Sequence, residues 1–269
     1  MPYFDRPDAR IFYQDLGAGR PVIATHGFSE TSDYWTIGGF ADLAARDLRL
    51  IPMDMRGHGR TRVQADARGF DAETTAADIS ALVAHLGLKS YDILAHATGS
   101  VVALRHAMGN PPGLRRMVLT SAASATAMAE PEFFTRMSAF YARHDWPDIF
   151  PRLRRSPEPF LNGLDRAVDP DRLWRAIEHV FAQCEPGQLS RFALDFYDDP
   201  DPRLAALRGI KADCLVISAE LDEMMLEPSD LIVNHVPKAT HVHLRGVGHM
   251  TAIECPRELA DLVVRFLTR

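Results

Sequence analysis

The sequence is poor in cysteine and has no long apolar run, and each lack excludes a class of protein. Its three cysteines, Cys184, Cys214 and Cys255, stand far apart in the chain. An odd number of cysteines without a CxxC pair predicts neither a disulfide framework nor a zinc site. No run approaches the roughly 18 apolar residues of a membrane span, and the N-terminal residues lack the apolar stretch of a signal peptide. We therefore expect a cytoplasmic protein with no metal ion and no membrane partner.

Positive charge is also in short supply. The chain carries 30 lysines and arginines against 36 aspartates and glutamates, which gives a net charge of −6. Because a surface that binds nucleic acid is normally basic, this balance argues against a nucleic-acid partner and favours a small molecule. With 269 residues, 46% of them hydrophobic, the chain fits one large globular domain or a domain that carries an insertion. Both a monomer and a homodimer remain open.

Short, continuous apolar runs alternate along the chain with amphipathic helical stretches. Continuous apolar runs are typical of strands that are covered on both faces. Asp71 before one helical stretch is a good N-cap, and Pro256 stands in the first turn of the last one. This alternation predicts an α/β fold with a mostly parallel, doubly wound sheet, and residues 9–19 suggest an antiparallel hairpin at its edge. The predicted strands are residues 20–27, 48–57, 91–97, 115–123, 213–222 and 240–249.

The alternation stops between residues 124 and 208. This segment shows no convincing strand, is rich in aromatic residues and is divided by prolines into short helical pieces. We interpret it as a helical cap inserted between two late strands. The predicted core is then residues 1–123 and 209–269, and the predicted cap is residues 124–208.

Three strand ends carry the residues of chemical interest, because an open α/β sheet binds its ligand at the carboxyl ends of its strands. The stretch "ILAHATGS" has the form of a nucleophile elbow, with Ala97 at the position of the nucleophile. Asp222 follows the next strand but one, with Glu220 as its nearest competitor, and His249 follows the last strand. Singly, each has an ordinary explanation as a turn, a helix cap or a structural histidine. Together they stand in the chain order nucleophile, acid, base.

The motifs "HGF", "MDMRGHGRT", "AHATG", "AELDE" and "GVGHMTAIECP" occur in the order found in α/β-hydrolase-fold proteins. In these motifs the chain resembles that superfamily over essentially its whole length, in particular the serine esterases and lactonases with a helical cap. The resemblance implies that Asp222 is the acid and His249 the base. It also implies that the backbone amides of Phe28 and Thr98 form an oxyanion hole, and it implies no cofactor and no metal. The departure from the pattern is Ala97, where the family has its nucleophile.

Three explanations of Ala97 remain open. The parent enzyme has serine at 97 and this chain is an inactive variant of it, or the chain is a natural binding protein that has lost hydrolysis. In the third explanation the site performs a chemistry that needs no serine. Ser29, Thr98 and Ser100 do not stand at the apex of the turn, so none of them is expected to replace the nucleophile. The first explanation predicts a serine hydrolase that acts on a largely apolar ester or lactone. A carbon–carbon bond hydrolase is an alternative.

The sequence gives only a coarse view of the substrate pocket. We expect Trp35, His96, Met250 and Trp146 to contact the substrate, because they stand near the strand ends or within the aromatic cap. An arginine cluster at residues 152–156 either holds a carboxylate of the substrate or is simply solvated. The identity of the ester, lactone or carbon–carbon bond does not follow from these residues.

Overall fold

A six-stranded parallel sheet forms the centre of the computed structural model, which describes residues 2–64, 69–125, 132–157, 159–161, 163–199 and 201–269. The strand order is β4-β3-β6-β7-β8-β9, with every neighbouring pair parallel. This confirms the predicted fold class. The strands are β3 (Arg20–Thr25), β4 (Leu48–Met53), β6 (Tyr91–His96), β7 (Leu114–Thr120), β8 (Asp213–Ala219) and β9 (Ala239–Leu244).

Each predicted strand is present, but each ends before its predicted boundary. Apolar residues continue past the strand ends into loops that are buried themselves: Met55, two residues beyond β4, and Ala122, two residues beyond β7, are both fully buried. Hydrophobicity reports burial and not hydrogen bonding between strands, so it does not mark where a strand ends.

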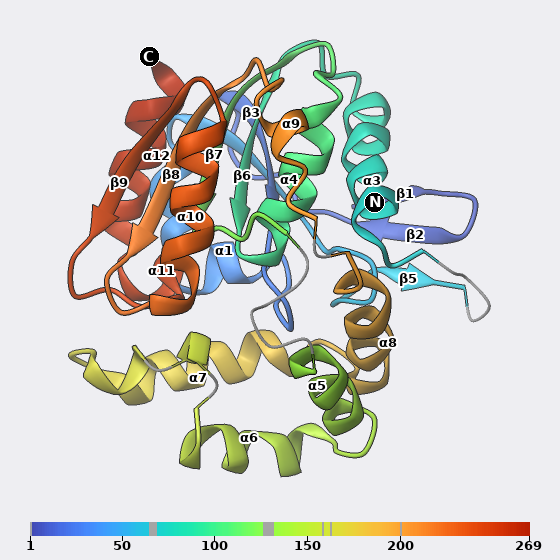
Figure 1. The fold of residues 1–269 in the computed structure, drawn as a ribbon, viewed down its shortest axis with the longest axis vertical. Coiled ribbons are helices and arrows are strands. Elements are labelled where there is room, and N and C mark those ends of the chain that lie inside the picture. Colours follow the sequence, from blue (N-terminus) through green and yellow to red (C-terminus); the bar gives the residue numbers. More distant parts are fainter. Residues whose placement is uncertain (1, 65–68, 126–131, 158, 162, 200) are drawn as a thin grey trace.

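Two layers of helices explain why the strands are apolar on both faces. In β3, Val22 packs with helices α2 (Phe40–Ala44) and α12 (Pro256–Thr268), whereas the next residue, Ile23, packs with helices on the opposite face. Figure 1 shows these layers on either side of the sheet. The helices of the second layer are α3 (Ala72–His85), α4 (Thr98–Met108) and α10 (Glu223–His235). The predicted N-cap is confirmed, because the Asp71 carboxylate accepts the N–H of Thr74 at 2.8 Å.

The N-terminal residues form a small antiparallel sheet of their own, in the order β1-β2-β5. Its strands are β1 (Tyr3–Asp5), β2 (Ala9–Phe12) and β5 (Arg62–Val63), and Tyr13 and Leu16 continue the antiparallel pairing along β4. The predicted hairpin within residues 9–19 is therefore wrong, although antiparallel pairing at the sheet edge is present. Gly17, at φ 81°, turns the chain toward β3 and does not close a hairpin.

Between β7 and β8 the described chain is helical and contains no strand. We call residues 124–208 the cap segment. Figure 1 shows its helices α5 to α8 at the end of the sheet to which the strands point, whereas the short helix α9 contacts α4 and α10. The cap segment thus closes the carboxyl edge of the sheet. Its helices are α5 (Phe133–Tyr141), α6 (Trp146–Arg155), α7 (Pro170–Phe181), α8 (Pro186–Phe196) and α9 (Leu204–Leu207), with short 3-10 turns at Pro159–Leu161 and Leu164–Arg166 and the helix α1 (Tyr34–Ile37) outside it.

Candidate functional site

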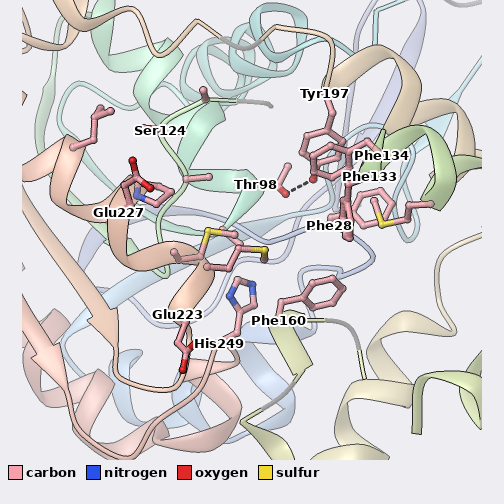
Figure 2. Close-up of a pocket in the computed structure, with 18 of the residues that line it drawn as sticks. Phe28, Thr98, Ser124, Phe133, Phe134, Phe160, Tyr197, Glu223, Glu227 and His249 are labelled. Atoms are coloured by element: carbon pink, nitrogen blue, oxygen red, sulfur yellow. Dashed lines mark hydrogen bonds between the residues drawn. The ribbon is translucent and has the colours of Figure 1, made fainter. Parts of the chain in front are cut away.

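A cavity of about 460 Å³ lies where the carboxyl ends of the strands meet the cap segment. Aromatic rings and methionines form a large part of its walls, and Figure 2 shows the labelled aromatic side chains converging from the core and from the cap. The residues of the core that line it include Phe28, Glu30, Ala97, Thr98, Glu223, Glu227, His249 and Met250. The cap segment contributes Phe133, Phe134, Met137, Phe160 and Tyr197, among others.

Ala97 occupies the sharp turn between β6 and α4, with φ 46° and ψ −116°. A residue with a Cβ atom is strained there by about 1–3 kcal/mol. Close packing of the turn also explains Gly99, since a Cβ atom at that position would lie 2.6 Å from the carbonyl oxygen of His26. In a nucleophile elbow such strain serves to display a reactive side chain. The methyl group of Ala97 is not reactive, so this strain displays no nucleophile here.

Asp222 and His249 form a buried pair beside this turn. Oδ2 of Asp222 accepts a hydrogen bond from Nδ1 of His249 at 2.9 Å, and the two residues are 1% and 5% exposed. Burial by itself lowers the pKa of His249, but the Asp222 carboxylate, together with Glu30 and Glu254, outweighs burial and raises the pKa above its ordinary value. Because Nδ1 holds its proton toward the carboxylate, Nε2 of His249 is left to exchange a proton. The competitor Glu220 instead accepts the N–H of Gly246 at 2.7 Å.

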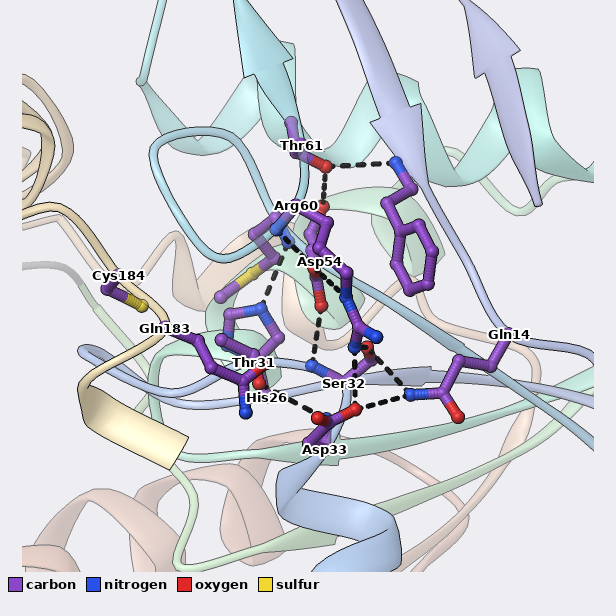
Figure 3. Close-up of polar contacts among 12 residues, drawn as sticks. Gln14, His26, Thr31, Ser32, Asp33, Asp54, Arg60, Thr61, Gln183 and Cys184 are labelled. Atoms are coloured by element: carbon purple, nitrogen blue, oxygen red, sulfur yellow. Dashed lines mark hydrogen bonds and ion pairs between the residues drawn. The ribbon is translucent and has the colours of Figure 1, made fainter. Parts of the chain in front are cut away.

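The loop between β3 and α1 carries Phe28, and a network around Asp54 holds this loop in place (Figure 3). The Asp54 carboxylate accepts the backbone N–H of Ser32 and that of Arg60, each at 2.7 Å. The Arg60 guanidinium also pairs with Asp33 at 2.6 Å. Asp54, directly after β4, therefore holds the loop through Ser32, and Phe28 of the same loop lines the cavity.

Thr98 is the first residue of α4, so its backbone amide belongs to the first helical turn, whose N–H groups have no partner within the helix. Its side chain faces the cap, and the Thr98 and Tyr197 hydroxyls are 2.6 Å apart. Phe28, Thr98 and Ala97 all line the cavity. The two residues expected to supply the oxyanion hole therefore border the same space as Ala97.

Of the predicted substrate contacts, only Met250 is among the described residues that line the cavity. Trp35 is fully buried and packs against Phe40, and Trp146 lies in the interior of the cap, where its indole N–H donates to the Cys184 carbonyl at 2.7 Å. The predictions for Trp35 and Trp146 are therefore wrong: both rings are needed as core.

The prediction for His96 is also wrong as a direct contact, because His96 lies behind His249 with the two ring centroids 4.7 Å apart. The arginine cluster plays no part in the described wall either, and its Arg154 pairs with Glu178 at 2.6 Å. Sequence reasoning missed Glu30 and Phe160. For Glu30 a signal was present, since it is the acidic residue directly after the loop motif "HGFS".

Comparison with known proteins shows the family of the chain. A model of the alpha/beta hydrolase family matches residues 22–262. The chain belongs to that family. It is 27% identical over 267 residues to a 2-hydroxymuconate semialdehyde hydrolase of Pseudomonas putida, covering 96% of this chain and 90% of the relative. A non-heme haloperoxidase of Rhodococcus erythropolis is 41% identical over 100 residues, and the match covers 37% of this chain and only 35% of the haloperoxidase.

Among solved structures, the enol-lactonase from Burkholderia xenovorans LB400 superposes with a TM-score of 0.83 at 18% identity, covering all of both chains. At that identity the likeness shows the fold alone. Two further findings concern the alpha/beta hydrolase described here. None of its described helices is long and apolar enough to cross a membrane. Its described residues include no group of three or more His, Cys, Asp or Glu side chains that could hold a metal ion.

Proposed function

We propose that this protein has the site of a serine hydrolase for esters or lactones of largely apolar substrates, with Ala97 at the position of the nucleophilic serine. In the parent form, a serine hydroxyl at position 97 would attack the carbonyl carbon. His249 would accept the hydroxyl proton at Nε2 and pass it to the leaving group, while Asp222 keeps the imidazole oriented. The amides of Phe28 and Thr98 would stabilise the oxyanion, at about 3 kcal/mol per donor.

The observation that carries this proposal is the backbone of Ala97. A strained φ of 46° is maintained at a residue whose side chain is a methyl group, and a carboxylate–imidazole pair is maintained beside it. Strain of this kind persists where it serves a function. With alanine at 97, we expect the chain to bind substrates of this class and not to cleave them.

The Ala97→Ser variant tests the proposal. Against a panel of p-nitrophenyl esters and lactones, we expect kcat/KM to rise by about 10³-fold or more over the chain with alanine, given the size of nucleophile effects in serine hydrolases. A fluorophosphonate probe should label the introduced serine in this variant and fail to label it in Ala97→Ser with His249→Gln. A folded Ala97→Ser protein that is neither labelled nor active on any member of the panel would contradict the proposal.

Carbon–carbon bond hydrolysis is a second candidate, favoured by the similarity to 2-hydroxymuconate semialdehyde hydrolase over 96% of the chain. The described cavity wall weighs against an anionic substrate such as a muconate derivative. Glu30, Glu223 and Glu227 belong to this wall, and no lysine or arginine does. A vinylogous 1,5-diketone without a carboxylate separates the two: its cleavage by Ala97→Ser, with all esters and lactones refused, would support the second candidate. A natural binding protein remains the explanation if the variant binds these molecules and cleaves none.

A further inference from the structure

A second carboxylate–imidazole pair lies directly behind the first, and the hydrolytic scheme does not use it. Oε1 of Glu30 is 3.2 Å from Nε2 of His96, and both side chains are inaccessible, with exposures of 1% and 0%. Glu30 comes from the loop after β3, and His96 is the last residue of β6, next to Ala97. Burying a charged carboxylate costs free energy unless the carboxylate is paired and hydrogen-bonded.

The two pairs form one continuous row. The His96 ring packs edge-on against the His249 ring at a centroid distance of 4.7 Å, and Tyr34 stacks on His96 at 4.5 Å. The order along the row is Asp222, His249, His96, Glu30, with a carboxylate at each end. The base of the site is thus held between its own acid and a second imidazole that has an acid of its own.

The contacts of His96 determine which of its nitrogens carries the proton. A lone pair on Nε2 would repel the Glu30 oxygen at 3.2 Å, so Nε2 carries the proton, although the contact is an electrostatic one and is not aligned as a hydrogen bond. The other nitrogen, Nδ1, is 3.1 Å from Oγ1 of Thr120. With Nε2 protonated, Nδ1 accepts this hydroxyl, whose alternative acceptor, the Ala95 carbonyl, is farther away at 3.5 Å. Burial lowers the pKa of His96 below its ordinary value, so the ring is neutral near pH 7. Burial opposes the charge on Glu30, but the neighbouring His96 and the Gly27 N–H hold the pKa of Glu30 below its ordinary value, so its carboxylate is ionised.

Glu30 has a second contact, which reaches the proposed oxyanion hole. Its Oε2 accepts the backbone N–H of Gly27 at 2.6 Å, and Gly27 precedes Phe28 in the loop. One buried side chain therefore connects the row of imidazoles to the loop whose amide would face the developing negative charge.

We propose that Glu30 is a positioning residue with two effects. It holds the His96 ring against His249 and thereby favours the protonated form of His249, and through Gly27 it fixes the loop that carries Phe28. The inference rests on the proposed function only in taking His249 as the base. The other charged or titratable groups around His249 are Asp222, Glu254 behind the turn of Gly248 and Met250, and Glu223 on the cavity wall.

The test is an NMR titration of the histidines in the chain with Ala97, with the His249 signals assigned by their loss in His249→Gln. In Glu30→Gln, which keeps an acceptor for Gly27, we expect the titration midpoint of His249 to fall by about one pH unit, the scale of one nearby buried charge. The matched control is Glu223→Gln, whose exposed carboxylate also lines the cavity but is screened by water, and which should leave the midpoint in place.

Glu30→Asp, which restores the charge, should return the midpoint toward the starting value. An unchanged midpoint in folded Glu30→Gln would overturn the proposal. If that variant does not fold, nitrogen chemical shifts of the unsubstituted protein decide: a neutral His96 protonated at Nε2 is expected, and the Nδ1–H form overturns the proposal. None of these measurements needs turnover, so an inactive Ala97→Ser variant would refute the proposed function without affecting this result.

Discussion

The hydroxyl groups of Thr98 and Tyr197 lie 2.6 Å apart and join the start of α4 to the cap segment across the cavity. The Tyr197 ring is held in turn by stacking on Phe134, with 3.4 Å between ring centroids. The side chain next to Ala97 is thereby tied to the helices that close the site. The position of the proposed oxyanion donor at Thr98 depends on the cap as well as on the sheet.

Removing the hydrogen bond between the Thr98 and Tyr197 hydroxyls should have a small effect on stability and a separate effect on catalysis. In Tyr197→Phe the ring still stacks on Phe134, so we expect the free energy of unfolding to fall by only about 0.5–1.5 kcal/mol. In the Ala97→Ser background kcat should fall by less than the roughly 100-fold expected for losing a donor outright, with KM nearly unchanged. Urea unfolding and ester hydrolysis measure the two effects. Tyr3→Phe, in β1 and away from the cavity, serves as the control, and equal kcat values in the two variants would count against the coupling.

Asp222 should matter far more than its neighbour Glu220. In Ala97→Ser, replacing Asp222 with asparagine should lower kcat by about 10⁴-fold, because the imidazole is no longer held with its proton on Nδ1. The carboxylate raises the pKa of His249, and a base works only when deprotonated, so losing it should move the acidic limb of the kcat/KM profile to lower pH. Glu220→Gln should leave both kcat and the limb in place. A loss of kcat with no shift of the limb would contradict the electrostatic role.

A buried histidine outside the site should make the fold sensitive to acid. Burial lowers the pKa of His106 in α4 to about 4, while the unfolded chain has the ordinary value near 6.5. The unfolded state therefore takes up the proton first, so this stabilisation is complete above about pH 6.5 and is lost as the pH falls toward 4. The loss should approach about 3 kcal/mol. Urea unfolding between pH 7 and pH 4.5 measures it: His106→Gln should flatten the slope, and His179→Gln at an exposed position should not.

The sheet and the chain positions of Ala97, Asp222 and His249 could be predicted because each depends on local sequence. A continuous apolar run identifies a strand covered on both faces, and the residue after its carboxyl end falls at the edge where ligands bind. The acid–base pair needed no knowledge of the cap. What occupies Glu220 is not local, since its carboxylate accepts the N–H of Gly246, which is 26 residues farther along the chain.

The cavity wall could not be predicted in the same way. Aromatic residues in short helices serve as core or as wall depending on how the helices pack, and sequence does not fix that packing: Trp146 points inward and Phe160 lines the cavity. The pairing of Glu30 with His96 joins residues from different strand ends, and no spacing along the chain indicates it.

The charge of the wall gives the last prediction. Three acidic residues, Glu30, Glu223 and Glu227, line the described cavity, and no lysine or arginine does. The carboxylate of Glu30 is buried against His96, and aromatic rings that attract cations surround the cavity. Three butyrate esters of similar size isolate this effect: the neutral 3,3-dimethylbutyl ester, its cationic isostere butyrylcholine, and the anionic 3-carboxy-3-methylbutyl ester. With Ala97→Ser, kcat/KM for the anionic ester should be lowest, by about 10-fold or more, which corresponds to about 1.4 kcal/mol.

The positions of these carboxylates predict how the discrimination responds to salt. Glu223 and Glu227 are exposed, so their contribution to the discrimination against the anionic ester should decrease as ionic strength rises. The contribution of buried Glu30 should persist. Replacing both Glu223 and Glu227 with glutamine should therefore remove the salt-dependent part of the discrimination and leave the rest. Glu185→Gln, at an exposed position that is not among the described lining residues, should change neither part. Equal kcat/KM for the three esters would contradict this prediction and show that the wall selects by shape alone. An electrostatic field that distinguishes the charges of the esters would change kcat/KM for at least one of them.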